Sequence, residues 1–252
     1  MTRAFFGRVP VDPLTLEDAV DAIVDLVRAG RGGYVVTPNV DHVVLAETDV
    51  AFRHAYVESA LSLADGMPVV WASRVLGAPL PAKVSGSDVA GPLLERAAKE
   101  RLRLYLLGGG PGAAERAAKT IAERWPGVTI AGTSAPLVRA DAPRSELLAL
   151  AAPVIDAKPD LVFVCLGAPK QEVLMHAVHR ELAPAVLLGF GAVVDFLAGN
   201  VTRAPRWMSE NGLEWAYRLG KEPRRMWRRY LLRDPKFAWI VARDALLRSR
   251  SR

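Results

Sequence analysis

Short apolar segments alternate with helical segments over most of the chain, and this alternation limits the fold more than any other feature. The apolar runs 102–107, 161–166 and 185–188 have the length of strands, and amphipathic segments lie between them. The expected strands are 34–36, 61–63, 102–107, 128–131, 161–166 and 185–188, and the expected helices are 14–27, 40–59, 87–100, 113–124, 145–157 and 169–182. Strands that alternate with helices of ten or more residues indicate βαβ units. The pattern therefore predicts an α/β fold with a Rossmann-like parallel sheet flanked by helices.

The positive charge of the chain is concentrated at its C-terminal end. Residues 201–252 contain fourteen Lys and Arg against five Asp and Glu, whereas residues 1–200 contain nineteen against twenty-two. The same segment holds four of the six tryptophans, which are Trp207, Trp215, Trp227 and Trp239. Basic residues interleaved with Trp and Leu are typical of a surface that meets anionic lipid headgroups. A nucleic-acid-binding face and a solvated helical end are the two other interpretations.

This break in composition predicts two parts. Residues 1–200 are expected to form the α/β core, and residues 201–252 a basic, Trp-rich helical appendage that associates with a membrane. Pro205, Pro223 and Pro235 are expected to divide the appendage into three short helical pieces, because proline interrupts a helix.

The cysteine content and the apolar runs restrict the cellular setting. The single cysteine, Cys165, cannot form an intrachain disulfide, which favours a reducing compartment. The first residues lack the apolar stretch of a signal peptide. No uninterrupted apolar run approaches the roughly 20 residues that cross a bilayer. We therefore expect a protein that is soluble or lies on a membrane surface.

A glycine-rich turn, Gly108–Gly112, follows an expected strand and opens an expected helix. Gly108, Gly110 and Ala113 fit the pattern G-x-G-x-x-A, in which glycines let the backbone approach a diphosphate near a helix N-terminus. A dinucleotide site also has an acidic residue about twenty residues on, and the corresponding stretch VTIAGTS has none. The turn, which includes Gly109, therefore predicts the diphosphate of another nucleotide, or simply a tight strand–helix connection.

Polar residues follow several of the expected strands, where an open α/β sheet binds its ligands. Thr37 and Asn39 follow the strand 34–36 and can orient a ligand. Asp65 follows the strand 61–63 and is a candidate general base, although an aspartate there can also bond the local backbone in an Asx turn. Gln171 can donate and accept hydrogen bonds, which suits a uracil edge or a sugar hydroxyl.

Other motifs give less support to chemistry. The apolar surroundings of Asp195 favour a structural role for this second carboxylate. The four histidines lack the spacing of metal ligands, and the chain has neither a Walker A lysine nor a G-x-S-x-G turn. These motifs leave two kinds of function to weigh. A nucleotide-sugar oxidoreductase or epimerase is weakened by the missing acidic residue, and a nucleic-acid or membrane-binding module would not need polar groups at strand ends.

Eight segments occur together and in order along the chain. They are TPNVDH at 37–42, LADGMP at 63–68, KVSGSD at 83–88, LLGGGPG at 106–112, GAPKQE at 167–172, GFGAVVDFLAG at 189–199, RAPRW at 203–207 and YRLGKEPRR at 217–225. Each segment is only modestly specific, but the ordered set resembles the WecG/TagA/CpsF family of bacterial glycosyltransferases over about residues 5–240.

The resemblance implies an inverting, metal-independent transfer of a hexose or an N-acetylhexosamine-type sugar, such as N-acetylmannosamine or its uronic acid. The donor would be a UDP-sugar, with no other cofactor, and the acceptor a polyprenyl-diphosphate-linked saccharide used in cell-surface polysaccharide biosynthesis. The protein would work in the cytoplasm on the anionic inner face of the bacterial plasma membrane. Nucleic acid is not an expected partner, and a homo-oligomer stays open because apolar residues of the first helices could form a subunit interface.

The family's functional residues transfer to this chain motif by motif. The resemblance places the catalytic base on Asp65 and assigns Thr37, Asn39 and Gln171 to the substrate pocket. We expect the departing UDP to be stabilised by the glycine turn and its helix dipole, in place of a metal ion.

Basic residues complete the expected pocket. The family's C-terminal arginines correspond to Arg218, Arg225 and Arg228, which would neutralise the diphosphate. Lys83 stands where the family usually has arginine. The resemblance assigns Lys83 to the substrate pocket, where lysine, unlike arginine, cannot hold phosphate in a bidentate fork.

Overall fold

The structure, a computed structural model, describes residues 2–250 apart from the side chains of Arg206, Arg225 and Arg250. Its centre is a six-stranded sheet, all of whose neighbouring strands pair in parallel, in the order β4-β3-β8-β7-β5-β6. The strands are β3 (Gly33–Val36), β4 (Leu61–Ser62), β5 (Arg103–Gly108), β6 (Thr129–Ser134), β7 (Leu161–Cys165) and β8 (Val186–Gly189). The predicted α/β fold with a parallel sheet is confirmed.

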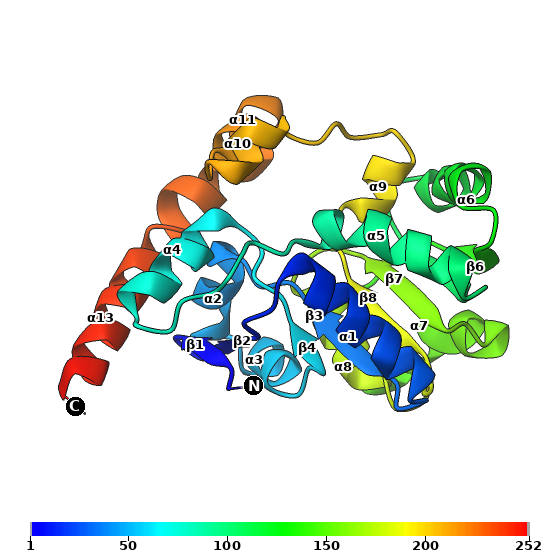
Figure 1. Ribbon diagram of the computed structural model, residues 1–252, viewed down its shortest axis with the longest axis horizontal. Coiled ribbons are helices and arrows are strands. Elements are labelled where there is room, and N and C mark those ends of the chain that lie inside the picture. The colour runs from blue at the N-terminus through cyan, green and yellow to red at the C-terminus, as the bar shows by residue number, and fades with distance from the viewer. Residues whose placement is uncertain (1, 251–252) are drawn as a thin grey trace.

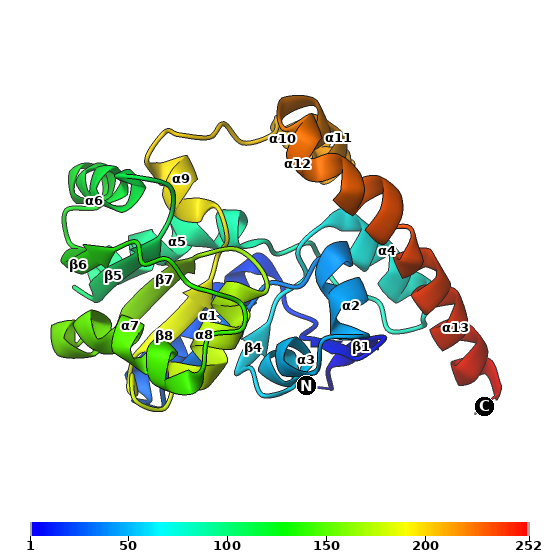
Figure 2. The ribbon, with the colours of Figure 1, turned by 180° about the vertical axis from the view of Figure 1, so that it is seen from behind.

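Helices cover both faces of this sheet (Figures 1 and 2). One face carries α1 (Leu16–Arg28), α5 (Gly86–Lys99), α6 (Ala113–Arg124) and α9 (Val193–Leu197). The other carries α7 (Arg144–Ala157) and α8 (Lys170–Val178), and α2 (Val40–Ala46) and α3 (Val50–Val57) continue the same core cluster. Every residue of β7 is buried, which explains why its sequence is a continuous apolar run instead of an alternating one.

Side-chain caps set the starts of several helices. Thr15 and Asp18 form a capping box at the start of α1, as the sequence predicts, and Ser85 and Asp88 form a second one at α5. Asp49 accepts a hydrogen bond from the Phe52 amide at 3.0 Å. This cap begins a new helix, so the single helix predicted over 40–59 is wrong and the segment forms α2 and α3.

Two elements in the first third of the chain have no counterpart in the sequence prediction. The strands β1 (Ala4–Phe6) and β2 (Val9–Val11) form an antiparallel hairpin. Helix α4 (Met67–Val75) follows the LADG segment. Both are short and largely apolar, so their sequences carry little periodic signal. The hairpin residues Phe6, Val9 and Val11 are buried in the larger of the two core clusters.

The C-terminal segment contains more elements than the three pieces predicted from its prolines. They are α10 (Arg206–Glu210), α11 (Glu214–Lys221), α12 (Pro223–Arg228), the π-helix η1 (Arg229–Arg233) and α13 (Lys236–Arg250). The three prolines stand at or next to helix starts, where the missing N–H costs nothing. The further break comes at Gly212, which has a φ of +70°.

Helix α13 packs back onto the body of the protein, beside the β1–β2 hairpin and α2 (Figure 1). Asp244 accepts a 2.6 Å hydrogen bond from the Gly7 amide, and Arg243 forms a 2.8 Å ion pair with Glu47. Ile240 is buried in the core cluster that also holds α2 and α3. The last helix therefore shares the core of the body, and the division at residue 200 stays a prediction. None of the helices within residues 2–250 has the length and apolar composition needed to cross a bilayer.

Replacing Ile240 with alanine tests how firmly α13 belongs to the core. Ile240 is 2% exposed, so Ile240→Ala should lower the free energy of unfolding by about 2 to 5 kcal/mol through lost burial and a residual cavity. Leu246, on the same helix, is 65% exposed, so Leu246→Ala should change the free energy of unfolding by no more than about 0.5 kcal/mol. Urea titration followed by circular dichroism measures both, and equal effects would contradict the docking of α13.

Candidate functional site

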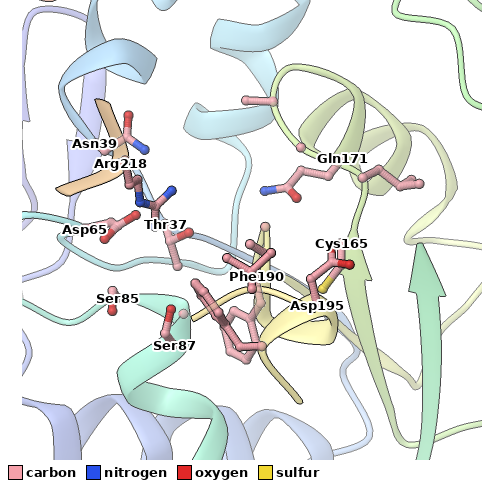
Figure 3. Close-up of a pocket in the computed structure, with 18 of the residues that line it drawn as sticks. Thr37, Asn39, Asp65, Ser85, Ser87, Cys165, Gln171, Phe190, Asp195 and Arg218 are labelled. Atoms are coloured by element: carbon pink, nitrogen blue, oxygen red, sulfur yellow. The ribbon is translucent and has the colours of Figure 1, made fainter. Parts of the chain in front are cut away.

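A cavity of about 850 Å³ lies beyond the carboxyl ends of the central strands. Its wall includes six of the residues predicted from sequence: Thr37, Asn39, Asp65, Gly109, Gln171 and Arg218. Figure 3 shows Asp65 and Thr37 on one side of this space and Gln171 on another. Parallel strands end at one edge of the sheet, so residues far apart in the chain meet there. The cavity also joins the Asp65 side of the site to the glycine turn.

The end of β3 supplies two side chains that are held in place by hydrogen bonds. Thr37 is buried, and its hydroxyl donates to the carbonyl oxygen of Gly189 at the end of β8, at 3.0 Å. Asn39 caps α2 by accepting from the His42 amide, and its Oδ1 also accepts from the Arg229 guanidinium at 3.0 Å. Both side chains are therefore positioned before any ligand arrives.

Asp65 follows β4 and faces the cavity. Among the groups that the structure describes, none donates a hydrogen bond to its carboxylate, so the geometry gives no support to an Asx turn here. Burial and the nearby Glu214 carboxylate raise the pKa of Asp65 to about 6, against the opposing effect of Arg218 and Lys83. A carboxylate with this pKa is ionised at neutral pH and still has useful affinity for a proton, which suits a general base.

The glycine turn is shaped by close packing against β7. A Cβ on Gly108, whose φ is +103°, would lie 2.4 Å from the Cys165 carbonyl oxygen. The Gly109 amide donates to that oxygen at 2.8 Å, and the Gly110 amide donates to the Asp195 carboxylate at 3.0 Å. This contact favours the predicted structural role of Asp195, but the same residue also lines the cavity, so that role stays a prediction. Because two amides of the turn already have acceptors, they would have to exchange them to bind a diphosphate, and that role stays a prediction.

Lys83 lies beside the cavity and joins the body to the C-terminal segment. Its ammonium group donates to Asp88 at 2.7 Å and to Ser209 of α10 at 3.1 Å, and Arg203 donates to the other oxygen of Asp88 at 2.7 Å. Burial opposes ionisation, but the contacts with Lys83, Ser85 and Arg203 lower the pKa of Asp88 to about 2. This geometry favours a docking role for Lys83, and its contact with substrate stays a prediction.

The predicted C-terminal arginines lie in different surroundings. Arg218 lines the cavity and forms a 2.6 Å ion pair with Glu214. Arg228 is exposed and stacks on the Trp227 ring at 5.3 Å, and the cavity wall formed by the described residues does not include it. The side chain of Arg225 lies outside the described part of the structure.

Two arginines that the sequence reasoning missed, Arg229 and Arg233, also line the cavity. Their Nε atoms lie 3.3 and 2.7 Å from the carboxylate of Asp41, which is buried at the start of α2. The available signal was their separation of four residues, which places basic groups on one side of a helix. This cluster connects η1 to the TPNVDH segment.

The described cavity wall carries charges of both signs, with six Lys and Arg against five Asp and Glu. The basic residues on the wall are Lys170, Arg203, Arg218, Lys221, Arg229 and Arg233. Burial, with Arg229 and Arg233, lowers the pKa of His42 to about 3, so this neighbour stays neutral. Within residues 2–250 no group of three or more His, Cys, Asp or Glu is arranged to hold a metal ion. The arrangement suits a ligand that carries negative charge.

Comparison with known proteins identifies the chain. The model of the glycosyl transferase WecG/TagA/CpsF family matches residues 4–251. The chain belongs to this family. It is therefore a glycosyltransferase, and the alternatives of an oxidoreductase, an epimerase and a non-enzymatic binding module are set aside.

Two relatives from Bacillus share about a third of their residues with this glycosyltransferase. The Bacillus subtilis (strain 168) protein is 34% identical over 213 residues, which is 84% of this chain and 80% of the relative. The Bacillus spizizenii protein is 31% identical over 211 residues, covering 84% and 79%. Both are named N-acetylglucosaminyldiphosphoundecaprenol N-acetyl-beta-D-mannosaminyltransferase.

The positions of Arg218 and Arg228 allow a paired test of the cavity. Arg218→Ala should lower the turnover of glycosyl transfer at least tenfold, because it removes a cation from the cavity wall beside Asp65. Arg228→Ala removes the same charge from an exposed position and should leave turnover on a short-chain, soluble acceptor within about twofold. A loss of similar size in both variants would show that overall charge, and not the cavity, matters.

Proposed function

We propose that this enzyme transfers an N-acetylhexosamine-type sugar, such as N-acetylmannosamine or its uronic acid, from a UDP-sugar to a polyprenyl-diphosphate-linked saccharide. The reaction inverts the anomeric centre and needs no metal ion. The Bacillus relatives support this proposal, because their names specify an N-acetylmannosaminyl group and a diphosphoundecaprenol-linked N-acetylglucosamine. The single observation that carries it is one cavity that joins the Asp65 carboxylate to the Arg218 guanidinium.

In the proposed reaction, the acceptor hydroxyl attacks the anomeric carbon of the donor from the side opposite to UDP. Asp65 takes the hydroxyl proton, a bond forms between the acceptor oxygen and the anomeric carbon, and the bond from that carbon to the phosphate oxygen breaks. UDP leaves with the bonding electron pair. A single in-line displacement of this kind inverts the configuration, and it requires one base and stabilisation of the leaving diphosphate.

Cationic side chains stabilise the leaving diphosphate in this proposal. Arg218, Arg229 and Arg233 line the cavity and come from helices that follow residue 200. Fixed positive groups in a partly buried site stabilise developing negative charge more strongly than they would in water. The C-terminal helices therefore complete the catalytic site.

The acceptor lipid implies that the enzyme works at the inner face of the bacterial plasma membrane. Trp207, Trp227 and Trp239 are exposed and lie in the basic C-terminal segment. Aromatic and basic side chains together bind anionic interfaces through apolar insertion and charge attraction. This contact would bring the cavity near a lipid-linked acceptor.

A screen for UDP release tests the proposed reaction. The purified enzyme is incubated with several UDP-sugars and a short-chain prenyl-diphosphate saccharide, with and without EDTA. UDP-N-acetylmannosamine or its uronic acid form should support acceptor-dependent UDP release at an unchanged rate in EDTA, and NMR of the product should show inversion. Loss of activity in EDTA would contradict metal independence, and no acceptor-dependent release from any UDP-sugar would contradict the proposed function.

Asp65 gives the reaction a predictable pH dependence. The base must be ionised, so turnover should rise with pH through about 6 and level off above about 7. Asp65→Asn should lower turnover by roughly 10²–10⁴ and leave the affinity for UDP nearly intact. Asp25→Asn, an exposed carboxylate on α1, is the matched control and should keep the wild-type rate and profile. Retained activity in Asp65→Asn would remove Asp65 as the base.

A further inference from the structure

Two adjacent side chains at the start of α8 are buried with unpaired polar atoms. Gln171 is 2% exposed and Glu172 is fully buried. The Gln171 amide nitrogen, Nε2, donates to Oε1 of Glu172 at 2.8 Å. The structure as described gives no hydrogen-bond partner to Gln171 Oε1 or to Glu172 Oε2. A buried polar atom without a partner costs about 1 to 3 kcal/mol, so this arrangement requires an explanation.

The surroundings show which of the two residues meets a ligand. Gln171 lines the cavity, and Figure 3 shows its side chain reaching into that space from α8. Glu172 is not on the wall formed by the described residues and lies behind Gln171. A Cβ on Gly189 would lie 2.7 Å from the Met175 methyl carbon and 3.2 Å from Gln171 Nε2. The glycine therefore makes room for the Gln171 amide at the end of β8.

We propose that Glu172 is a positioning residue that holds Gln171 through Nε2, so that Gln171 presents its carbonyl oxygen to the ligand as a hydrogen-bond acceptor. A glutamine side chain can turn its amide over and offer either group, whereas an ionised carboxylate only accepts. Glu172 therefore selects one of the two orientations. The unpaired Oε1 of Gln171 is the atom that the ligand satisfies.

The chemistry of the acceptor defines the ligand group. Gln171 Oε1 takes an N–H or O–H donor, and on the proposed UDP-sugar this is the imide N–H of uracil or the acetamido N–H of the sugar. Thr37 provides a second acceptor nearby, because its hydroxyl hydrogen is committed to the Gly189 carbonyl oxygen. The inference thus deepens the proposed function and rests on it.

The same contact makes ligand affinity depend on pH. Burial raises the pKa of Glu172 to about 7, although its hydrogen bond with Gln171 opposes the shift. The ionised carboxylate holds Nε2, whereas a protonated Glu172 can donate to Gln171 Oε1 and withdraw the acceptor from the ligand. Affinity should therefore be highest above pH 7 and fall as the pH drops below it.

Other ionisable groups near Glu172 can be separated from this effect. Tyr56 on α3 faces Glu172, and burial, with Glu172, Asp65 and Asp41, raises the pKa of Tyr56 well above its usual value. The Tyr56 hydroxyl binds Nδ1 of His42 on α2, whose pKa is lowered to about 3 by burial and arginines, so neither group titrates near pH 7. Asp65 does titrate near this range, and Asp65→Asn removes it from the measurement.

Calorimetric binding of the UDP-sugar that is active in the screen tests the inference. A UDP-sugar is used because, unlike UDP, it has no terminal phosphate that titrates near pH 6. The Asp65→Asn enzyme should bind it three- to tenfold more weakly at pH 6.0 than at pH 8.5, which corresponds to the loss of one hydrogen bond. Adding Glu172→Gln should weaken binding at pH 8.5 and abolish this pH dependence. Glu95 is an exposed carboxylate on α5, and adding Glu95→Gln instead should leave the affinities at pH 6.0 and pH 8.5 unchanged.

Two altered ligands identify the donor group. If uracil supplies it, methylation at N3 removes the pH dependence. If the sugar supplies it, replacing the acetamido group with an O-acetyl group, which has no N–H, removes the dependence and N3 methylation does not. Equal affinities of the Asp65→Asn enzyme at both pH values would overturn the inference, and this result does not depend on how well a Glu172 variant folds. Unchanged affinity in a folded Glu172→Gln variant at pH 8.5 would also overturn it. If no UDP-sugar binds at either pH, the proposed function fails and the inference with it.

Discussion

Parallel pairing of the six strands is the constraint on which the rest of this structure depends. It brings the carboxyl ends of β3, β4, β5, β7 and β8 to one edge, and the cavity lies beyond that edge. Thr37, Asp65 and Gln171 come from three different strand ends and line the same space. The buried, fully apolar β7 anchors this arrangement, because helices cover it on both faces.

The C-terminal helices contribute most of the basic residues on the described cavity wall. Arg229 and Arg233 reach the buried carboxylate of Asp41, and Arg218 lines the cavity near Asp65. Hydrogen bonds separate the pKa values of two acids near the cavity. Asp65 has no hydrogen-bond donor in the described part of the structure and its pKa is raised, whereas Asp88 has several donors and its pKa is lowered. The Asp65 carboxyl group is thus suited to proton transfer, and the Asp88 carboxylate is suited to binding the cationic groups of Lys83 and Arg203.

Much of the fold was predictable because its signals are local. The alternation of strands and helices predicted the parallel sheet, and Thr15 with Asp18 marked the start of α1. The break at Asp49, helix α4 and the β1–β2 hairpin were missed, because a short polar break between two helical segments and short apolar elements leave the periodicity nearly unchanged. For the site, motif order selected Thr37, Asn39, Asp65 and Gln171, which share one cavity.

The sequence by itself determined the order of strands and helices in the sheet region, the polar residues that follow the strands and the family, since each depends on residues close together in the chain or on their order. Tertiary structure decided which charges meet. It placed Arg229 and Arg233 on the cavity wall and Arg228 outside it, it gave the amides of Gly109 and Gly110 to Cys165 and Asp195, and it buried Glu172 behind Gln171. Hydrogen-bond partners and desolvation depend on what lies nearby in space, and for these groups the neighbours come mostly from distant parts of the chain.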